Sequence, residues 1–200
     1  MTRLGMLIDL STCIGCHACS VACKAEFDVP LGRFRDTVKY VEQSGQPHAR
    51  RHFIPVLCNH CEDAPCTKVC PSHAVVRLEG GQVVIDKERC RGKQDCIEAC
   101  PYGAIYFDPD EKVAQKCTLC VHRTEQGLAP ACVEVCPTHT RVFGDLDEPT
   151  SDLAKRMAQG PTAVWKEGEN TRPKVRYVDP RGALPLVADA LLNPRTRTRR

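Results

Sequence analysis

The stretch that decides the fold reads CNHCEDAPCTKVCP at residues 58–71 and resumes as CRGKQDCIEACP at residues 90–101. The first part spaces its four cysteines by two, four and three residues and ends in Pro71. The second part has the length of a C-x₂-C-x₂-C-x₃-C-P run, but Lys93 stands where its second cysteine would be. Two further cysteine groups flank this pair, CIGCHACSVAC at residues 13–23 and a group at 117–137 with eleven residues between its second and third cysteines.

This spacing is typical of iron–sulfur proteins of the two-cluster ferredoxin type. There, a C-x₂-C-x₂-C-x₃-C-P run gives three thiolates to one [4Fe–4S] cluster, and its fourth cysteine ligates the other cluster. The same crossing rule predicts four ligand sets here. They are set I (Cys13, Cys16, Cys19, Cys136), set II (Cys117, Cys120, Cys132, Cys23), set III (Cys58, Cys61, Cys66, Cys100) and set IV (Cys90, Cys96, Cys70). The first and last groups must then meet in space.

Set IV lacks one thiolate, and Lys93 occupies the vacant position. Because three thiolates hold three irons and leave a corner of the cube unligated, we predict a [3Fe–4S] cluster in set IV and [4Fe–4S] clusters in the other three sets. Two alternatives stay open: Lys93 is an amine ligand to a fourth iron, or Asp95 or water completes the cube. The missing thiolate and the charge of Lys93 should both raise the reduction potential of this cluster.

Composition excludes several other classes of protein. The chain has 15 cysteines, an odd number, and no apolar N-terminal segment of the secretory type, which argues against a disulfide framework. Zinc sites use two well-separated C-x₂-C pairs, which does not explain three ligands within seven residues. The formal charge of +3 omits the clusters; four clusters of roughly −2 would bring it to about −5, so a nucleic-acid partner is not expected. No stretch is long and apolar enough to span a membrane.

The expected fold is α+β, with two interleaved two-cluster ferredoxin-like units built from short hairpins and helices. Residues 1–27 and 102–148 form the outer unit, 58–101 the inner unit, and 28–57 an insertion with one strand near 37–42. Strands are predicted at 5–9 and 141–147, hairpins around Gly80 and around residues 108–110, and a helix from about Cys19 through Phe27. Residues 149–200 form an irregular extension over the surface or a partner. It starts with a helix capped by Thr150, Ser151 or Asp152 and ends in a mobile RTRTRR.

Several histidines lie close to the cysteines in sequence. A Rieske-type centre would need two histidines in place of two cysteines on one iron, whereas three of the sets are already complete. We therefore interpret these histidines as packing and hydrogen-bonding groups, and the large aromatic residues as packing residues. They are His17, His60, His73, His122 and His139, with Tyr102, Tyr106, Phe107 and Trp165. The sequence has no nucleophile–base set, phosphate loop or dinucleotide motif, so no catalytic site is expected.

The four cysteine groups, with the strings CNHCEDAPCTKVCP and CPYGAI, closely resemble the iron–sulfur electron-transfer (beta) subunit of dimethyl sulfoxide reductase-type molybdoenzymes, over about residues 5–145. The resemblance implies a complex with a molybdopterin catalytic subunit and an integral-membrane anchor that has a quinone site. In the related nitrate reductase beta chain, tryptophan replaces the second cysteine of the third group and gives a [3Fe–4S] cluster near the membrane. Lys93 falls at the corresponding place.

By that resemblance, set I faces the molybdenum subunit and set IV faces the quinone site. Electrons then pass singly between them, and a raised potential at set IV would suit delivery toward quinone, as in sulfite oxidation. The chain is expected to be peripheral to the cytoplasmic membrane, with the cytoplasmic side favoured although the sequence does not determine it. The competing hypotheses are a free polyferredoxin serving soluble enzymes and a zinc-stabilised interaction module.

Overall fold

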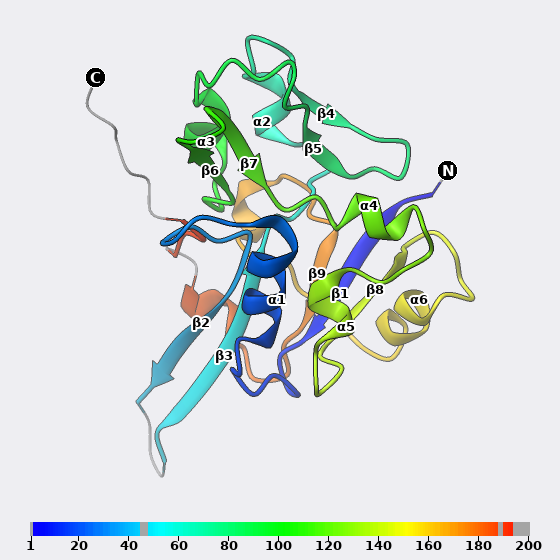
Figure 1. Cartoon of the computed structure of the whole chain (residues 1–200). Coiled ribbons are helices and arrows are strands. Elements are labelled where there is room, and N and C mark those ends of the chain that lie inside the picture. Colours follow the sequence, from blue (N-terminus) through cyan, green and yellow to red (C-terminus); the bar gives the residue numbers. More distant parts are fainter. Residues whose placement is uncertain (1, 45–47, 188–189, 194–200) are drawn as a thin grey trace.

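The computed structural model describes residues 2–44, 48–187 and 190–193, and Figure 1 shows a mixed arrangement of short helices and small sheets. The described strands form one sheet of three strands and three two-stranded hairpins. The RTRTRR segment at 195–200 lies outside the described residues. None of the helices in the described ranges is long and apolar enough to cross a lipid bilayer.

The three-stranded sheet joins the two ends of the chain. Its middle strand β1 (Leu4–Asp9) contains the fully buried Met6, Leu7 and Ile8. It pairs antiparallel with β8 (Arg141–Asp145), and both of these strands were predicted from the sequence. On its other side, β1 pairs parallel with β9 (Val175–Val178). The extension was expected to be irregular, so β9 corrects that prediction. Alternating burial explains it, since Val175 and Tyr177 are buried while Arg176 is half-buried.

The insertion forms a long hairpin instead of the single strand expected. Strands β2 (Asp36–Gln43) and β3 (Arg50–Leu57) pair antiparallel along their whole length and project from the body of the molecule (Figure 1). Strand β3 buries Ile54, Val56 and Leu57 at its inner end. The Tyr177 hydroxyl donates a hydrogen bond to the Pro55 carbonyl over 3.0 Å, which ties the hairpin to β9.

The segment between residues 58 and 116 gathers in the upper part of Figure 1. It contains α2 (Pro65–Lys68) and α3 (Asp95–Ala99), which pack against each other. The two predicted hairpins are confirmed as β4 (Val75–Arg77) with β5 (Val83–Ile85), and β6 (Ile105–Asp108) with β7 (Val113–Lys116). Strand β7 also contacts β5, so the second hairpin leans on the first.

The remaining helices lie around the three-stranded sheet and the hairpin of β2 and β3. Helix α1 (Ala18–Phe27) continues past Cys23, as expected from Lys24 standing where other groups have proline. Helix α6 (Asp152–Met157) is capped by Ser151, whose hydroxyl accepts from the Ala154 N–H over 3.0 Å. Of two short α-helices in the last cysteine group, one follows Cys120 and the other contains Cys132, and two 3-10 helices lie in the extension. They are α4 (Val121–Thr124), α5 (Ala131–Glu134), η1 (Glu167–Glu169) and η2 (Leu184–Val187).

The extension covers the loop that follows Cys58. Three backbone hydrogen bonds of 2.9–3.0 Å join residues 171–174 to residues 59–63. Elsewhere in the extension, Trp165 is fully buried, packs 5.4 Å from the Tyr102 ring and donates its indole N–H to the Val187 carbonyl over 3.1 Å. The extension is therefore part of the core around this cysteine group.

Ending the chain after Glu148 should leave the protein with less iron. The truncation removes β9, Trp165 and the cover over residues 59–63, so water reaches the buried thiols and the edge of β1 is left unpaired. Iron per chain and soluble yield after anaerobic purification measure the effect. A truncation after Asn193 keeps every contact named above and serves as the reference; equal iron in the two shortened proteins would contradict the covering role.

Candidate iron–sulfur centres

The cysteines of set I surround one cavity. Cys13, Cys16 and Cys19 come from the loop before α1 and its first turn, and Cys136 follows α5. Arg141, on β8, forms part of the same wall. Pairing of β1 with β8 carries the two cysteine groups to the same end of the sheet, because Ile8 is opposite Arg141 in the register.

The cysteines of set III surround a second cavity. Its wall contains Cys58, Cys61, Cys66 and Cys100, each of them buried, together with Lys116. Helix α2 carries Cys66, and Cys100 comes directly after α3, which packs against α2. Within the described residues, no three His, Cys, Asp or Glu side chains converge as they would on a single ion; the thiols surround cavities instead.

Sets II and IV also bring together cysteines that are far apart in sequence. The Cys23 thiol is close enough to the thiols of Cys117, Cys120 and Cys132 to interact with them electrostatically. The Cys96 thiol interacts in the same way with Cys70 and Cys90. Helix α1 contacts α5, and this packing holds Cys23 beside the last group.

Contacts between sets give the order I, II, III, IV. The Asp36 carboxylate hydrogen-bonds to the thiols of Cys19 in set I and Cys132 in set II. Cys117 in set II interacts with Cys58 in set III, and Cys96 in set IV interacts with Cys100 in set III. Neighbouring sets therefore approach closely enough for their charges to affect one another.

The loop around Lys93 has the same backbone form as the loop around Cys16. Gly15 and His17 have φ of 71° and 60°, and Gly92 and Gln94 have φ of 63° and 67°. His17 and Gln94 are the N-caps of α1 and α3. Glycine tolerates this left-handed conformation best, which explains the CIGC and CRGK strings. Lys93 thus takes the backbone place of a second cysteine, and like Cys16 it is exposed.

A second repeated device follows each cysteine that precedes proline. The N–H three residues after the cysteine donates to the cysteine carbonyl over 3.1–3.2 Å, at a residue with left-handed φ. The next N–H then reaches the sulfur, from Ala74 to Cys70 over 3.3 Å, from Ala104 to Cys100 over 3.4 Å, and from Thr140 to Cys136. The left-handed residues are His73, Gly103 and His139. The sequence interpretation missed this backbone role of two of the histidines.

The other histidines make packing and hydrogen-bonding contacts. His17 packs edge-on against Tyr40 at 5.3 Å, and His122 hydrogen-bonds to Glu26 over 2.6 Å. His60 is fully buried, and its Nδ1 accepts from the Val83 N–H over 3.1 Å. The pKa of His60 is well below its usual value because of burial and the nearby Lys116, so the ring is neutral and carries its proton on Nε2.

Two donors unpaired within the described residues, His60 Nε2 and Asn59 Nδ2, lie in the wall of the set III cavity, where they suit sulfur acceptors. Within the described chain, His60 Nε2 and both amide atoms of Asn59 are buried without a hydrogen-bond partner. Both residues line the cavity. Buried donors are rarely left unpaired, and hydrogen bonds to cluster sulfurs are one way in which proteins adjust cluster potentials. The residues of set III therefore fit an iron–sulfur cluster.

Burial makes most of these thiols poor acids in the absence of metal. It raises the pKa of Cys19 to about 11 and those of Cys61, Cys66, Cys96 and Cys117 to about 12. In Cys70 and Cys136 burial acts in the same direction, but hydrogen bonds from the following turn outweigh it and lower the pKa. Because metals bind the thiolate, cluster assembly must displace protons from the thiols with raised pKa.

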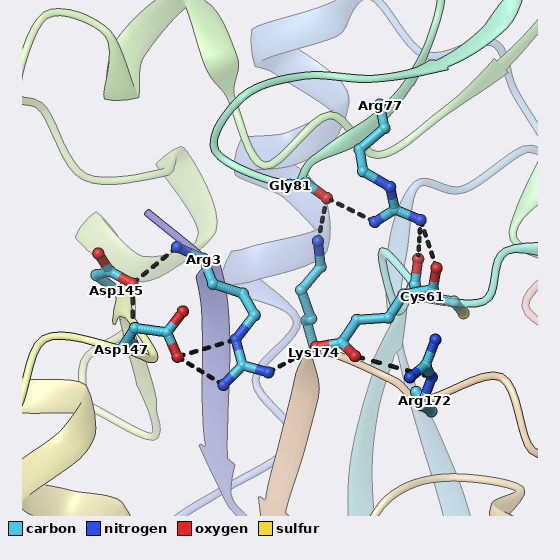
Figure 2. Close-up of polar contacts among 9 residues, drawn as sticks. Arg3, Cys61, Arg77, Gly81, Asp145, Asp147, Arg172 and Lys174 are labelled. Atoms are coloured by element: carbon cyan, nitrogen blue, oxygen red, sulfur yellow. Dashed lines mark hydrogen bonds and ion pairs between the residues drawn. The ribbon is translucent and has the colours of Figure 1, made fainter. Parts of the chain in front are cut away.

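A charged network covers the outer side of the set III loop (Figure 2). Arg77 donates to the carbonyls of Cys61 and Glu62 over 3.1 and 2.6 Å. Lys174 and Arg77 both approach the Gly81 carbonyl. Arg3 bridges the Glu62 and Asp147 carboxylates over 2.6 and 2.7 Å. The network joins the N-terminus, the inner hairpin and the extension around Cys61.

A fully buried ion pair lies between sets I and II. Arg141 contacts both carboxylate oxygens of Asp36, at 2.5 and 2.8 Å, and each side chain is 1% exposed. The pair interacts with Cys19 and Cys132. Sequence reasoning missed it, although a charged residue at the start of a closing strand is a signal that could have been followed.

Four groups of mostly buried thiols, with backbone and side-chain donors close to sulfur, define a ferredoxin-like iron–sulfur protein. A family model described as a 4Fe-4S dicluster domain matches residues 49–146, and a 4Fe-4S binding domain matches residues 4–25. The chain belongs to the family of iron–sulfur beta subunits of molybdoenzyme complexes, whose members transfer electrons.

Three relatives illustrate the range of the family. The chain is 44% identical to a subunit of tetrathionate reductase from Salmonella typhimurium, over 88% of this chain and 72% of the relative. It is 47% identical to the electron transfer subunit of thiosulfate reductase from Salmonella typhi, over 77% and 81%. It is 37% identical to a subunit of sulfite dehydrogenase from Allochromatium vinosum, over 77% and 73%.

Removing the iron should unfold the protein. The loss of iron to a chelator should be faster at lower pH. At pH 6, more protons compete for thiols whose pKa burial has raised than at pH 8, so an iron chelator should strip the clusters faster. The loss of iron–sulfur absorbance and of circular dichroism, followed together under anaerobic conditions, measures both effects. A protein that keeps its circular dichroism and protease resistance after complete iron loss would contradict this coupling.

Proposed function

We propose that the chain holds four clusters in a row and carries single electrons between a molybdopterin catalytic subunit and a membrane anchor with a quinone site. Sets I, II and III each supply four thiolates to a [4Fe–4S] cluster, and set IV supplies three to a [3Fe–4S] cluster. Sets I and II form the outer of two interleaved units, and sets III and IV the inner one. When bound, the clusters take up and release one electron at a time.

The observation that carries this proposal is the order of contacts between neighbouring sets. Asp36 touches thiols of sets I and II, Cys117 interacts with Cys58, and Cys96 interacts with Cys100. Electron transfer from one end of the chain to the other requires such a continuous row of sites. A free polyferredoxin, the alternative, needs the same row but no partner at its ends.

Both ends of the row reach the surface, which favours partners there. At one end Cys16 is exposed, and Ile14 beside it is 56% exposed. At the other end Lys93 is exposed, and Val69, next to Cys70, is 42% exposed. We assign the Cys16 end to the molybdenum subunit and the Lys93 end to the anchor, which makes the chain peripheral to the membrane. A raised potential at set IV would suit electron delivery toward quinone, as in sulfite oxidation.

Purification of the tagged chain from its native host in mild detergent tests the partners. The expected result is a large protein containing molybdenum and a hydrophobic third subunit in stoichiometric amounts, with about fifteen irons per copy of this chain after subtracting those of the large subunit. A chain that purifies alone with all its iron would favour the free polyferredoxin.

Substituting Lys93 distinguishes the three interpretations of set IV. With a three-iron cluster, the oxidised protein shows a three-iron EPR signal, and Lys93→Cys removes it and adds about one iron per chain. Lys93→Met, the matched control, should leave the signal unchanged. A three-iron signal that appears only in Lys93→Met would identify the amine as a ligand. If neither the parent nor Lys93→Met shows the signal and set IV retains four irons, Asp95 or water completes the cube.

A further inference from the structure

Lys116 is a buried cation placed between set II and set III. It is the last residue of β7 and directly precedes Cys117, and only 2% of it is exposed. Its ammonium hydrogen-bonds to the carbonyl of Val83 on β5 and, over 2.8 Å, to that of Cys117. It also hydrogen-bonds to the sulfur of Cys58. Lys116 therefore touches the wall of set III while its backbone leads into set II.

The contacts of Lys116 require the charged form. A protonated lysine has three N–H donors and no acceptor. The three partners of Nζ are two carbonyl oxygens and one sulfur, all of which accept when Cys58 is a thiolate ligand. A neutral amine would turn its lone pair toward one of these acceptors. The geometry thus identifies Lys116 as a fixed positive charge.

No carboxylate balances this charge in the part of the chain that the structure describes, since none of the ion pairs found there includes Lys116. By contrast, the buried Arg141 is paired with Asp36, and Arg3 with Glu62 and Asp147. An isolated buried charge is costly unless an opposite charge accompanies it. The nearest sulfurs that can supply negative charge belong to Cys58, Cys66 and Cys117.

We propose that Lys116 is shared between the clusters of set II and set III and raises the reduction potentials of both. The inference rests on the ligand sets proposed above. Each cluster gains one negative charge on reduction, and a cation held in a low-dielectric interior stabilises the reduced form of whichever cluster is nearby. Since the ammonium faces sulfurs of both sets, it shifts the potentials of the two central sites in the same direction. Lys116 is a positioning and tuning residue and is not a ligand.

Anaerobic redox titration followed by EPR tests the proposal on the intact complex. Cys66→Ser and Cys132→Ser first identify which transitions belong to sets III and II. In Lys116→Met, the midpoints of these two transitions should move to lower potential, and those of sets I and IV should stay in place. Lys116→Arg, which keeps the charge, should give midpoints close to those of the parent protein.

The matched control is Lys87→Met. This removes a positive charge that is exposed and paired with Glu111 over 2.6 Å, so it changes net charge without changing the interior. Its four midpoints should be those of the parent. Midpoints of sets II and III that are unchanged in Lys116→Met, or a shift in only one of them, would overturn the shared role. A purified parent protein without four redox transitions would instead reject the proposed function.

Loss of clusters in Lys116→Met is also informative when compared with Lys116→Arg. If the methionine variant loses iron from sets II and III while the arginine variant retains it, the charge is required at this position and the proposal is supported. If both variants lose the same amount of iron, the shape of the side chain matters and its charge does not, which overturns the proposal. Iron and sulfide per chain give this result independently of enzyme activity.

Discussion

The close approach of thiols from distant parts of the chain is the constraint on which the rest of the structure depends. Cys136 lines a cavity with Cys13 and Cys19, and Cys23 reaches the group that begins at Cys117. Only 5% of the residues are aromatic, so much of the core consists of sulfur, and 10 of the 15 cysteines are buried. Burial alone would keep most of those thiols protonated. Folding and metal binding are therefore coupled, because the same interior that excludes water needs the metal to make its thiolates.

The sequence predicted the parts of the fold that local spacing determines. The β4–β5 and β6–β7 hairpins follow from apolar runs on either side of a turn, and the length of α1 follows from Lys24 in place of proline. The crossing rule predicted that the first and last cysteine groups meet, and the pairing of β1 with β8 brings them to the same end of the sheet. The ligand sets remain predictions, although the thiols of each set lie together.

The features that the sequence did not predict depend on contacts far apart in the chain. Strand β3 carries Pro55 and three basic residues, so its pattern is weak until β2 lies beside it. Strand β9 is only four residues long and needs the edge of β1. In the sequence Lys116 looks like a surface lysine. The residues that bury it come from β5 and from the Cys58 loop, which are distant in the chain. Its burial could not be inferred from its own neighbours in sequence.

In the proposed arrangement of clusters, Lys93 and Lys116 affect cluster potentials for different physical reasons. Lys93 is exposed, so water and salt screen its charge, and its main consequence is the absence of a thiolate from an otherwise unaltered loop. Lys116 replaces no ligand, but its charge is buried beside sulfurs of two sets, where screening is weak. Ligand loss therefore acts at one exposed end of the row, and a buried charge acts at its centre. The proposed arrangement would thus let the chain adjust the potential of the end site and those of the central pair independently.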